Sequence, residues 1–306
     1  MLALVTGGAG FIGGHLIDAL LNTGWEVISV DDKSATSTST FYNNKSVKNY
    51  QIDISDRVKV QELSGNLLEQ EKKIDYVFHL AARTKIQLAI DDLRNTFDTN
   101  VMGTINVLDL CREHDVKRFI LSSTSAVYGN NSLPNSESQI PECLNPYSAS
   151  KLCCEQVCDL YTSLYGIPTV KLRYFNVFGE RMPNRGIYAP VVSIFIDQEK
   201  NNLPLTIIGD GSQSRDFVYV KDVARANILA ARTSADLAVG EVFNVGAGEG
   251  FVIKEIADYV STNQINIPTR KNEADATLAD ISKIKDRLGW LPLMNLRNWL
   301  EIRKGV

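Results

Sequence analysis

Tyr147 and Lys151 carry side chains that could do acid–base chemistry together. They stand four residues apart in the segment YSASK, and on a helix two residues at that spacing lie on the same face. An unperturbed tyrosine has a pKa near 10, and lowering it by about three units requires roughly 4 kcal/mol of preferential stabilisation of the phenolate. A neighbouring ammonium group and a positively charged ligand can supply that stabilisation. The pair therefore predicts a tyrosine that acts as a general base on a substrate hydroxyl.

A glycine-rich turn near the start of the chain could bind phosphate. The segment TGGAGFIG at 6–13 places Gly7, Gly10 and Gly13 after an apolar stretch and before a helical pattern. Glycines permit a tight turn and close approach of the backbone to a ligand, and the N-terminus of the helix offers N–H groups to a pyrophosphate. In this context the turn predicts a dinucleotide site.

Acidic residues follow the next two expected strands. Asp31, with Asp32 beside it, ends the second strand, where a carboxylate accepts hydrogen bonds from the ribose hydroxyls of adenosine and repels a 2′-phosphate. Lys33 is the only cation nearby in the sequence, so NAD is favoured over NADP. Asp53 and Ile54 follow the third strand, where a carboxylate could reach the adenine amino group.

A frame of parallel strands is needed to bring these residues together. Short apolar segments typical of strands occur at 3–6, 25–30, 50–52, 75–80, 118–123 and 168–173. Helical patterns, such as those at 90–114 and 146–165, lie between them. Strands that are apolar on both faces and separated by helices predict a parallel sheet covered on both sides. We therefore expect an α/β fold with a Rossmann doubly wound parallel sheet.

The alternating pattern ends near residue 180, at the polar loop ERMPNRG. We expect an NAD-binding domain over 1–179 and 215–245, which includes the strand-and-helix pattern DFVYVKDVARANILAA. A smaller, discontinuous α/β domain that binds the substrate is expected over 180–214 and 246–306.

The composition is that of an ordinary soluble protein, with 44% hydrophobic and 22% charged residues. A net charge of −4 gives no sign of a nucleic-acid surface, and no stretch approaches the roughly 18 uninterrupted apolar residues of a membrane helix. The start MLALVTGG lacks the basic flank of a signal peptide, so we expect a cytoplasmic chain. Five cysteines without a framework spacing are expected to be reduced, and no metal site is expected.

Taken together, these motifs resemble a known family. The chain is similar to the extended short-chain dehydrogenases/reductases of the NAD-dependent epimerase/dehydratase family, and most like its UDP-glucose and other UDP-hexose 4-epimerases. The similarity runs over nearly the whole chain, through TGGAGFIG, HLAA (79–82), NVMGT (100–104), SSTSAVYG (122–129), YSASK, RYFNVFG (173–179), GDGSQSRDFVYVKD (209–222), FNVG (243–246) and LGWLP (288–292).

The resemblance implies that Thr124, Tyr147 and Lys151 are catalytic. Thr124 would hydrogen-bond the 4-hydroxyl of a sugar and help pass its proton to Tyr147, with Ser123 as an adjacent alternative. Helices 90–114 and 146–165 would form a four-helix bundle in a homodimer.

The resemblance also implies NAD as the cofactor. The residues expected to contact it are Gly7, Gly10, Phe11, Ile12, Gly13, Asp31, Asp32, Asp53, Ile54, Leu80, Ala81, Ala82, Asn100, Ser122, Tyr147, Lys151, Tyr174 and Val177. Among them, Asn100 would brace the active-site strand and Val177 would lie near the nicotinamide. Epimerases often have a cofactor-contacting lysine after HLAA; here the run is Arg83-Thr84-Lys85, which leaves that role open.

A UDP-sugar is the substrate that the resemblance implies. Asn176 would contact its phosphates, and Arg215 and Arg270 would clamp the pyrophosphate, since the fork of an arginine suits phosphate oxygens. Glu273 would accept a hydrogen bond from the uridine ribose. Thr277 stands where, in the epimerases, a small residue leaves room for a C2 acetamido group.

The residues around Thr124 discriminate between reactions that one fold can support. Ser123-Thr124-Ser125-Ala126 contains no carboxylate, whereas the family's 4,6-dehydratases resemble Thr-Asp-Glu here and its decarboxylases carry a glutamate. We therefore expect 4-epimerisation of a UDP-hexose through a transient 4-keto sugar, with UDP-GlcNAc/UDP-GalNAc accepted beside UDP-glucose/UDP-galactose. The alternatives are a UDP-uronic acid 4-epimerase, a dehydrogenase or reductase with net cofactor turnover, and a non-catalytic NAD-sensing protein.

Overall fold

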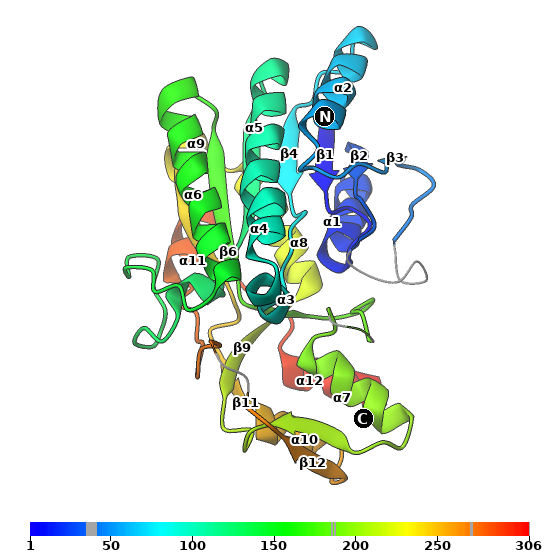
Figure 1. Ribbon diagram of the computed structural model, residues 1–306, viewed down its shortest axis with the longest axis vertical. Helices are drawn as coiled ribbons and strands as arrows, with labels where there is room; N and C mark the ends of the chain where they lie inside the picture. Colours follow the sequence, from blue (N-terminus) through cyan, green and yellow to red (C-terminus); the bar gives the residue numbers. More distant parts are fainter. Residues whose placement is uncertain (35–41, 185, 187, 270–271, 306) are drawn as a thin grey trace.

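A seven-stranded sheet forms the larger part of the molecule (Figure 1). The computed structural model describes residues 1–306 apart from 35–41, 185, 187, 270–271 and 306. The strands are ordered β10-β6-β5-β4-β1-β2-β3, and every neighbouring pair is parallel. Their bounds are β1 Leu2–Thr6, β2 Glu26–Val30, β3 Lys48–Tyr50, β4 Tyr76–His79, β5 Arg118–Thr124, β6 Thr169–Tyr174 and β10 Val242–Val245. The predicted doubly wound parallel sheet is confirmed.

Helices cover both faces of this sheet. One face packs against α1 (Phe11–Asn22), α8 (Val220–Arg232) and α11 (Ser282–Leu288), and the other against α2 (Arg57–Glu69), α5 (Gly103–His114) and α6 (Pro146–Tyr165). Successive residues of β1 alternate between the two layers, with Ala3 and Val5 on the α1 side and Leu4 on the other. Burial on both faces explains why the strands read as continuous apolar runs.

The helix that carries Tyr147 and Lys151 has the predicted bounds. Asn145 caps it by accepting a hydrogen bond from the Ser148 N–H, Pro146 occupies the first turn, and Gly166 ends it in a left-handed conformation.

The predicted helix at 90–114 is instead broken into α4 (Leu93–Phe97), a π-helical turn (Asp98–Met102) and α5, preceded by α3 (Ile86–Asp91). The carbonyl of Asn100, within the π-helical turn, accepts hydrogen bonds from Thr104 and Cys154. Such turns are frequent at functional sites.

A second, smaller layer packs below the sheet in the view of Figure 1. It contains a three-stranded sheet, β11-β9-β7, and a two-stranded sheet, β12-β8. Its elements are β7 (Asn176–Phe178), α7 (Val191–Lys200), β8 (Leu205–Ile208), β9 (Ser214–Tyr219), β11 (Gly250–Val252), α10 (Ile253–Val260), β12 (Gln264–Ile267) and α12 (Leu296–Lys304). A separate apolar core holds these elements together.

The domain boundaries differ from the expected ones in two places. Strand β9 was expected in the first domain, but it pairs with β7 and β11 in the small sheet. The chain returns to the large sheet with α8 and β10. Helix α11 was expected in the second domain, but it and Trp290 pack into the core of the large sheet. Apolar periodicity predicts a strand or helix without specifying which sheet it joins.

Across the described residues, every helix is too short or too polar to span a membrane. The described part of the chain also holds no group of three or more His, Cys, Asp or Glu side chains that could bind a metal.

Candidate active site

The glycine turn packs so tightly that side chains are excluded from it. A Cβ atom on Gly13 would lie 2.1 Å from the carbonyl oxygen of Gly7, and one on Gly7 would lie 2.7 Å from the backbone nitrogen of Ala81. Gly7 also has a φ of +69°, which glycine adopts at little cost. Gly10 is the N-cap of α1, so no side chain covers the first N–H groups of that helix. This cradle fits a dinucleotide pyrophosphate.

Phe11 and Ile12 form the first turn of α1 and pack against the core of the smaller domain. The backbone N–H groups of Leu80 and Ala81 donate to the Thr6 hydroxyl, at 3.2 Å each, which brings the end of β4 beside the cradle. Ala82 continues from there. The cradle is thus built mainly from backbone.

The carboxylate of Asp31 supports the glycine turn. It accepts hydrogen bonds from the N–H of Ala9 (3.0 Å) and of Lys33 (2.8 Å). Burial raises the pKa of Asp31 from its ordinary value, opposed by those two hydrogen bonds. Asp32, next along the chain, accepts from the backbone N–H of Ser34 at 2.9 Å.

Asp53 and Ile54 are used locally. The carboxylate of Asp53 closes a turn by accepting from the N–H of Ser55 at 2.8 Å. The side chain of Ile54 is buried beneath α5, where it would meet a Cβ atom placed on Gly103.

Asn100 holds a loop rather than a strand. Its side-chain oxygen accepts from the N–H of Arg83 (2.8 Å), and its amide donates to the carbonyl of Arg83 (3.0 Å) and the hydroxyl of Ser150 (2.9 Å). We expected Asn100 to brace the active-site strand β5. Instead it ties the loop after β4 to α6, because the π-helical turn aims it at that loop. Lys85, further along the loop, donates to the carbonyl of Ala189 at 3.4 Å.

Thr124, Tyr147 and Lys151 meet where β5 ends and α6 begins. The hydroxyl of Thr124 hydrogen-bonds with the phenol of Tyr147 and also accepts from the N–H of Ala126 at 3.1 Å. The ammonium group of Lys151 donates to the carbonyl of Ser122 at 2.8 Å, and this side chain is only 3% exposed. The structure thus brings the three predicted catalytic side chains to one point.

Burial shifts both titrating groups toward their neutral forms. It raises the pKa of Tyr147 to about 12, although the hydrogen bond from Thr124 acts in the opposite direction. It also lowers the pKa of Lys151. A phenolate at neutral pH therefore requires further positive charge in the site, which the nicotinamide ring of NAD⁺ carries.

Two serines that precede Thr124 on β5 are hydrogen-bonded within the protein. Ser122 donates to the hydroxyl of Tyr174 at 3.0 Å, and that hydroxyl donates in turn to Asn227 at 2.9 Å, so both predicted cofactor contacts belong to a buried network. Ser123 lies on the opposite face of β5 and donates to the carboxylate of Glu155. Ser123 therefore does not fit the role of an alternative to Thr124, because successive strand residues alternate in direction.

The predicted substrate residues lie on the small sheet and the segment beside it. Asn176 on β7 donates to the carbonyl of Asp216 at 3.1 Å. Arg215 on the adjacent β9 donates to the carbonyl of Asp275 at 3.0 Å. Burial lowers the pKa of its guanidinium, and the negative charge of Glu273 opposes that effect. Val177, between the two layers, packs against both apolar cores.

Thr277 is buried, and its hydroxyl accepts from the N–H of Asp216 at 3.4 Å. Arg270, predicted to clamp the pyrophosphate, lies outside the described residues.

Asp216 is a site residue that the motifs did not reveal. Its fully buried carboxylate accepts from the N–H groups of Ala247 (2.6 Å), Gly248 (2.8 Å) and Ala279 (3.0 Å). Burial raises its pKa to about 6, against the pull of those hydrogen bonds. The available signal was an acidic residue at the start of the apolar strand pattern DFVYV. Backbone hydrogen bonds of Asp216 also link the segments that carry Asn176 and Thr277.

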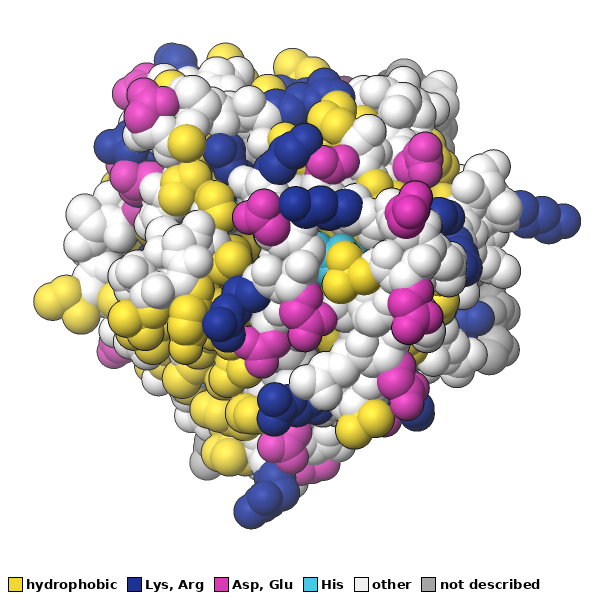
Figure 2. Space-filling view, turned by 90° about the horizontal axis from the view of Figure 1, so that it is seen from above, with side chains coloured by type: hydrophobic (Ala, Val, Ile, Leu, Met, Phe, Trp, Pro, Cys, Tyr) yellow, Lys and Arg dark blue, Asp and Glu magenta, His cyan; other side chains and the backbone are white. Residues whose placement is uncertain are grey.

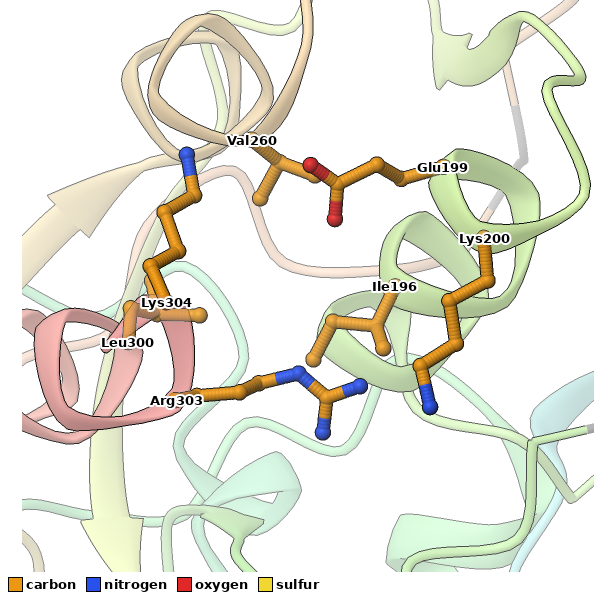
Figure 3. Close-up of a pocket in the computed structure, with 7 residues that line it drawn as sticks. All are labelled: Ile196, Glu199, Lys200, Val260, Leu300, Arg303 and Lys304. Carbon is orange, nitrogen blue, oxygen red and sulfur yellow. The ribbon is translucent and has the colours of Figure 1, made fainter.

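Two hollows lie elsewhere, in the smaller domain. The larger, about 470 Å³, is surrounded by α7, α10 and α12, and Figure 3 shows its lining: Ile196, Glu199, Lys200, Val260, Leu300, Arg303 and Lys304. The other, about 230 Å³, adjoins it at Ile196, Lys200 and Arg303. The described residues that line them include none of the predicted site, so the site is identified by its chemistry rather than by cavity size.

Comparison with known proteins agrees with this geometry. The family model "NAD dependent epimerase/dehydratase family" matches residues 3–246. A putative UDP-glucose 4-epimerase of Methanocaldococcus jannaschii is 35% identical, over 98% of this chain and 98% of its own.

Two solved structures extend the comparison. The UDP-glucose 4-epimerase of Thermotoga maritima with UDP-glucose superimposes with a TM-score of 0.91 at 33% identity, covering 100% of this chain and 99% of its own. The UDP-glucuronic acid 4-epimerase of Bacillus cereus, in complex with UDP-glucuronic acid and NAD, gives 0.86 at 34% identity, covering 98% and 97%. The fold, the cradle and these similarities together mean that the chain belongs to the NAD-dependent epimerase/dehydratase family and uses NAD as its cofactor.

Proposed function

We propose that this protein is a UDP-hexose 4-epimerase that interconverts UDP-glucose and UDP-galactose. The observation that carries the proposal is the meeting of Thr124, Tyr147 and Lys151 at the end of β5, with no carboxylate in the adjoining Ser123–Ala126. Such a site can move a proton and lacks the extra acid that elimination of water would need. The named 4-epimerases among the relatives support this reaction.

The chain's own residues supply the proton chemistry. NAD, held in the cradle of Gly7, Gly10 and Gly13, would supply reversible hydride exchange with C4 of the sugar. Tyr147 takes the proton of the 4-hydroxyl, with Thr124 aligning that hydroxyl, and gives the proton back after the 4-keto sugar has presented its other face. Lys151 carries an ammonium group four residues from Tyr147 on the same helix, and its charge together with that of NAD⁺ favours the phenolate against the effect of burial.

The hexose must rotate in the pocket to present its other face while the nucleotide stays fixed. Arg215 and Arg270 would hold the pyrophosphate, Asn176 a phosphate oxygen, and Glu273 the uridine ribose. The hexose would then be free to rotate about its link to the phosphate. Thr277 is small, so we propose that UDP-GlcNAc and UDP-GalNAc enter the same pocket.

A UDP-uronic acid 4-epimerase is the second candidate. The Bacillus cereus enzyme, which was solved with UDP-glucuronic acid, is 34% identical to this chain, against 33% for the Thermotoga maritima enzyme. The same proton and hydride transfers apply to both sugars. The two candidates therefore differ in which C6 group the pocket binds, a hydroxymethyl group or a carboxylate.

Incubating the purified protein separately with UDP-galactose, UDP-GalNAc and UDP-galacturonate tests these alternatives. We expect C4 inversion of the first two without accumulation of reduced nicotinamide. Inversion of UDP-galacturonate alone would transfer the proposal to the second candidate. Steady formation of NADH in step with product would identify a dehydrogenase, and a chain that transforms none of the sugars would not be an epimerase of this class.

We also propose a homodimer through α4, the π-helical turn and α6. These elements expose Leu93, Met102, Leu160, Leu164 and Tyr165, which are between 47% and 67% accessible. Figure 2 shows hydrophobic side chains gathered on the left of the view, the side on which α6 lies in Figure 1. Light scattering should give twice the mass of the chain, and Leu164→Glu should yield a monomer.

A further inference from the structure

Glu155 occupies the same helix face as the catalytic pair. Helix α6 carries Tyr147, Lys151 and Glu155 at four-residue intervals, so their side chains project in one direction. Glu155 is 5% exposed. Carboxylates are rarely buried to this extent unless they are paired.

The partners of Glu155 come from two strands of the large sheet. One carboxylate oxygen accepts from the hydroxyl of Ser123 on β5 and from Nε of Arg173 on β6, the latter at 2.9 Å. The other oxygen accepts from Nη2 of Arg173 at 2.7 Å. Ser123 directly precedes Thr124. The carboxylate therefore fixes α6 to the strand that presents Thr124 to Tyr147.

Arg173 is itself held in place. Its guanidinium lies 4.8 Å from the centre of the Tyr128 ring, and the hydroxyl of Tyr128 donates to Asn244 at 2.7 Å. The guanidinium is thus restrained from two sides and presents its fork to Glu155.

Stability alone gives little reason for such a pair. Replacing a buried ion pair by apolar side chains of similar size is often neutral or stabilising, because removing two charges from water is costly. Arg173 and Glu155 are 4% and 6% exposed at the side chain. Glu155 also lies one helical turn beyond Lys151 and, through Ser123, holds the residue that precedes Thr124, so it acts on the relative placement of α6 and β5 that brings Thr124 to Tyr147.

We propose that Glu155, held by Ser123 and Arg173, is a positioning residue that sets Tyr147 and Lys151 against Thr124 and places a negative charge near Lys151. This inference rests on the proposed 4-epimerase function for its kinetic consequence. Its electrostatic consequence concerns the protein itself and is measurable without substrate.

The charges around Lys151 give the sign of that consequence. Burial has the largest effect on Lys151 and lowers its pKa, whereas Cys154, Cys158 and then Glu155, all on α6, raise it. From β4, His79 faces it, and burial lowers the pKa of that imidazole to about 3, so it is neutral near pH 7. Removing the charge of Glu155 therefore lowers the pKa of Lys151, and the alkaline limb of the activity moves to lower pH.

A matched control exists on the same helix. Asp159, one turn beyond Glu155 and further from Tyr147, forms an ion pair with the buried Lys171 on β6. It links the same helix to the same strand without touching β5. Asp159→Asn thus weakens the attachment of α6 without moving Thr124.

The experiment compares Glu155→Gln, Asp159→Asn and the apolar double variant Glu155→Met with Arg173→Met. For each, kcat, KM, the pH profile and the thermal unfolding midpoint are measured. We expect Glu155→Gln to lower kcat about 10- to 100-fold with KM changed less than about threefold, as misplacement of catalytic groups does. Asp159→Asn should keep kcat within about twofold. The double variant should fold and keep the low kcat.

Wild-type kcat in a folded Glu155→Gln protein, or in the double variant, overturns the positioning role. If Glu155→Gln does not fold, the kcat of the double variant tests the positioning role instead. Ser123→Ala, which leaves the ion pair intact, is then expected to lower kcat several-fold. Equal losses in Asp159→Asn and Glu155→Gln also overturn it, since both would then act only through helix attachment.

An NMR titration separates this inference from the proposed function. The Lys151 signal in protein labelled at lysine Cε is identified by its absence in Lys151→Met. We expect its pKa to fall in Glu155→Gln and to stay unchanged in Asp159→Asn. A wild-type protein that converts no UDP-sugar refutes the proposed function, whereas an unchanged Lys151 pKa refutes the electrostatic role of Glu155.

Discussion

The cofactor end and the substrate end of this molecule are built in different ways. The cofactor cradle comes from one contiguous stretch, β1 to α1, closed by the end of β4, and its shape is set by backbone contacts of Gly7, Gly13 and Ala81. The substrate end joins distant segments through Asp216, whose backbone carbonyl accepts from Asn176 and whose buried carboxylate accepts from the N–H groups of Ala247 and Ala279. One end is specified locally and the other only by the completed fold.

The catalytic pair lies between these two ends and should show the largest effect. Tyr147→Phe removes the proton-accepting oxygen while keeping the ring, so we expect kcat to fall by about 10³-fold or more. Bound NAD and the thermal unfolding midpoint should stay near wild type. A Tyr147→Phe protein with more than a tenth of wild-type kcat would show that another group moves the proton.

A cradle that is set by backbone should not tolerate one methyl group. In Gly13→Ala the new Cβ would meet the Gly7 carbonyl at 2.1 Å, and overpacking of this kind costs about 1–3 kcal/mol. We expect a lower unfolding midpoint and loss of co-purified NAD, measured by absorbance after acid release. Retention of full NAD content would refute the backbone-built cradle.

The substrate end should fail differently. Asp216→Ala leaves three N–H groups without their acceptor, and we expect KM for the UDP-sugar to rise about 10- to 30-fold, or roughly 1.4–2 kcal/mol. Bound NAD should not change, because Asp216 does not contact the cradle. A parallel loss of NAD would erase the distinction between the two ends.

The raised pKa of Asp216 also predicts a pH dependence. Its folded pKa is about 6, above the unfolded value near 3.9, so between these values the folded state binds more protons than the unfolded state. The contribution of this group to the free energy of unfolding therefore falls as pH rises from about 4 to 6, by on the order of 2 kcal/mol at most. Urea titrations across this range should show that slope in the wild type and its absence in Asp216→Asn.

The smallest effect is expected at Gly65, which serves as a control for Gly13. Gly65 lies in α2 with nothing within 4 Å of an added Cβ. Alanine there should raise the free energy of unfolding by about 0.5–1 kcal/mol, because helical glycine is entropically costly. If Gly65→Ala lowered the free energy of unfolding, close contacts of the added Cβ atom would not explain the effect expected for Gly13→Ala.

Local patterns predicted six strands of the large sheet, although the third lies at Lys48–Tyr50 and not at 50–52, and they predicted the helix at 146–165 and the cradle, because each depends on residues close in the sequence. The break in the helix at 90–114 depends on hydrogen bonds from Thr104 and Cys154 to Asn100, and Cys154 is distant in sequence. The hydrogen bond of Ser123 depends on Glu155 of α6, which is distant in sequence. Such tertiary partners leave no signal in apolar periodicity.

The role of Asp216 also depends on tertiary partners that the sequence pattern does not reveal. An acidic residue in an apolar strand could as well have been a surface charge, and only the approach of Ala247, Gly248 and Ala279 shows that it is an internal acceptor. The membership of β9 in the small sheet was hidden for the same reason.

Asp216 binds its neighbours through their backbone N–H groups, so the attachment does not depend on polar groups in their side chains. Gly248, with a φ of +71°, and the buried Ala279 are constrained by their own surroundings, whereas other residues of these segments can change without losing the attachment. A lineage could explore new sugars by altering those other residues while inheriting the cofactor cradle intact. The three N–H groups on one carboxylate thus form a point from which substrate range can diverge.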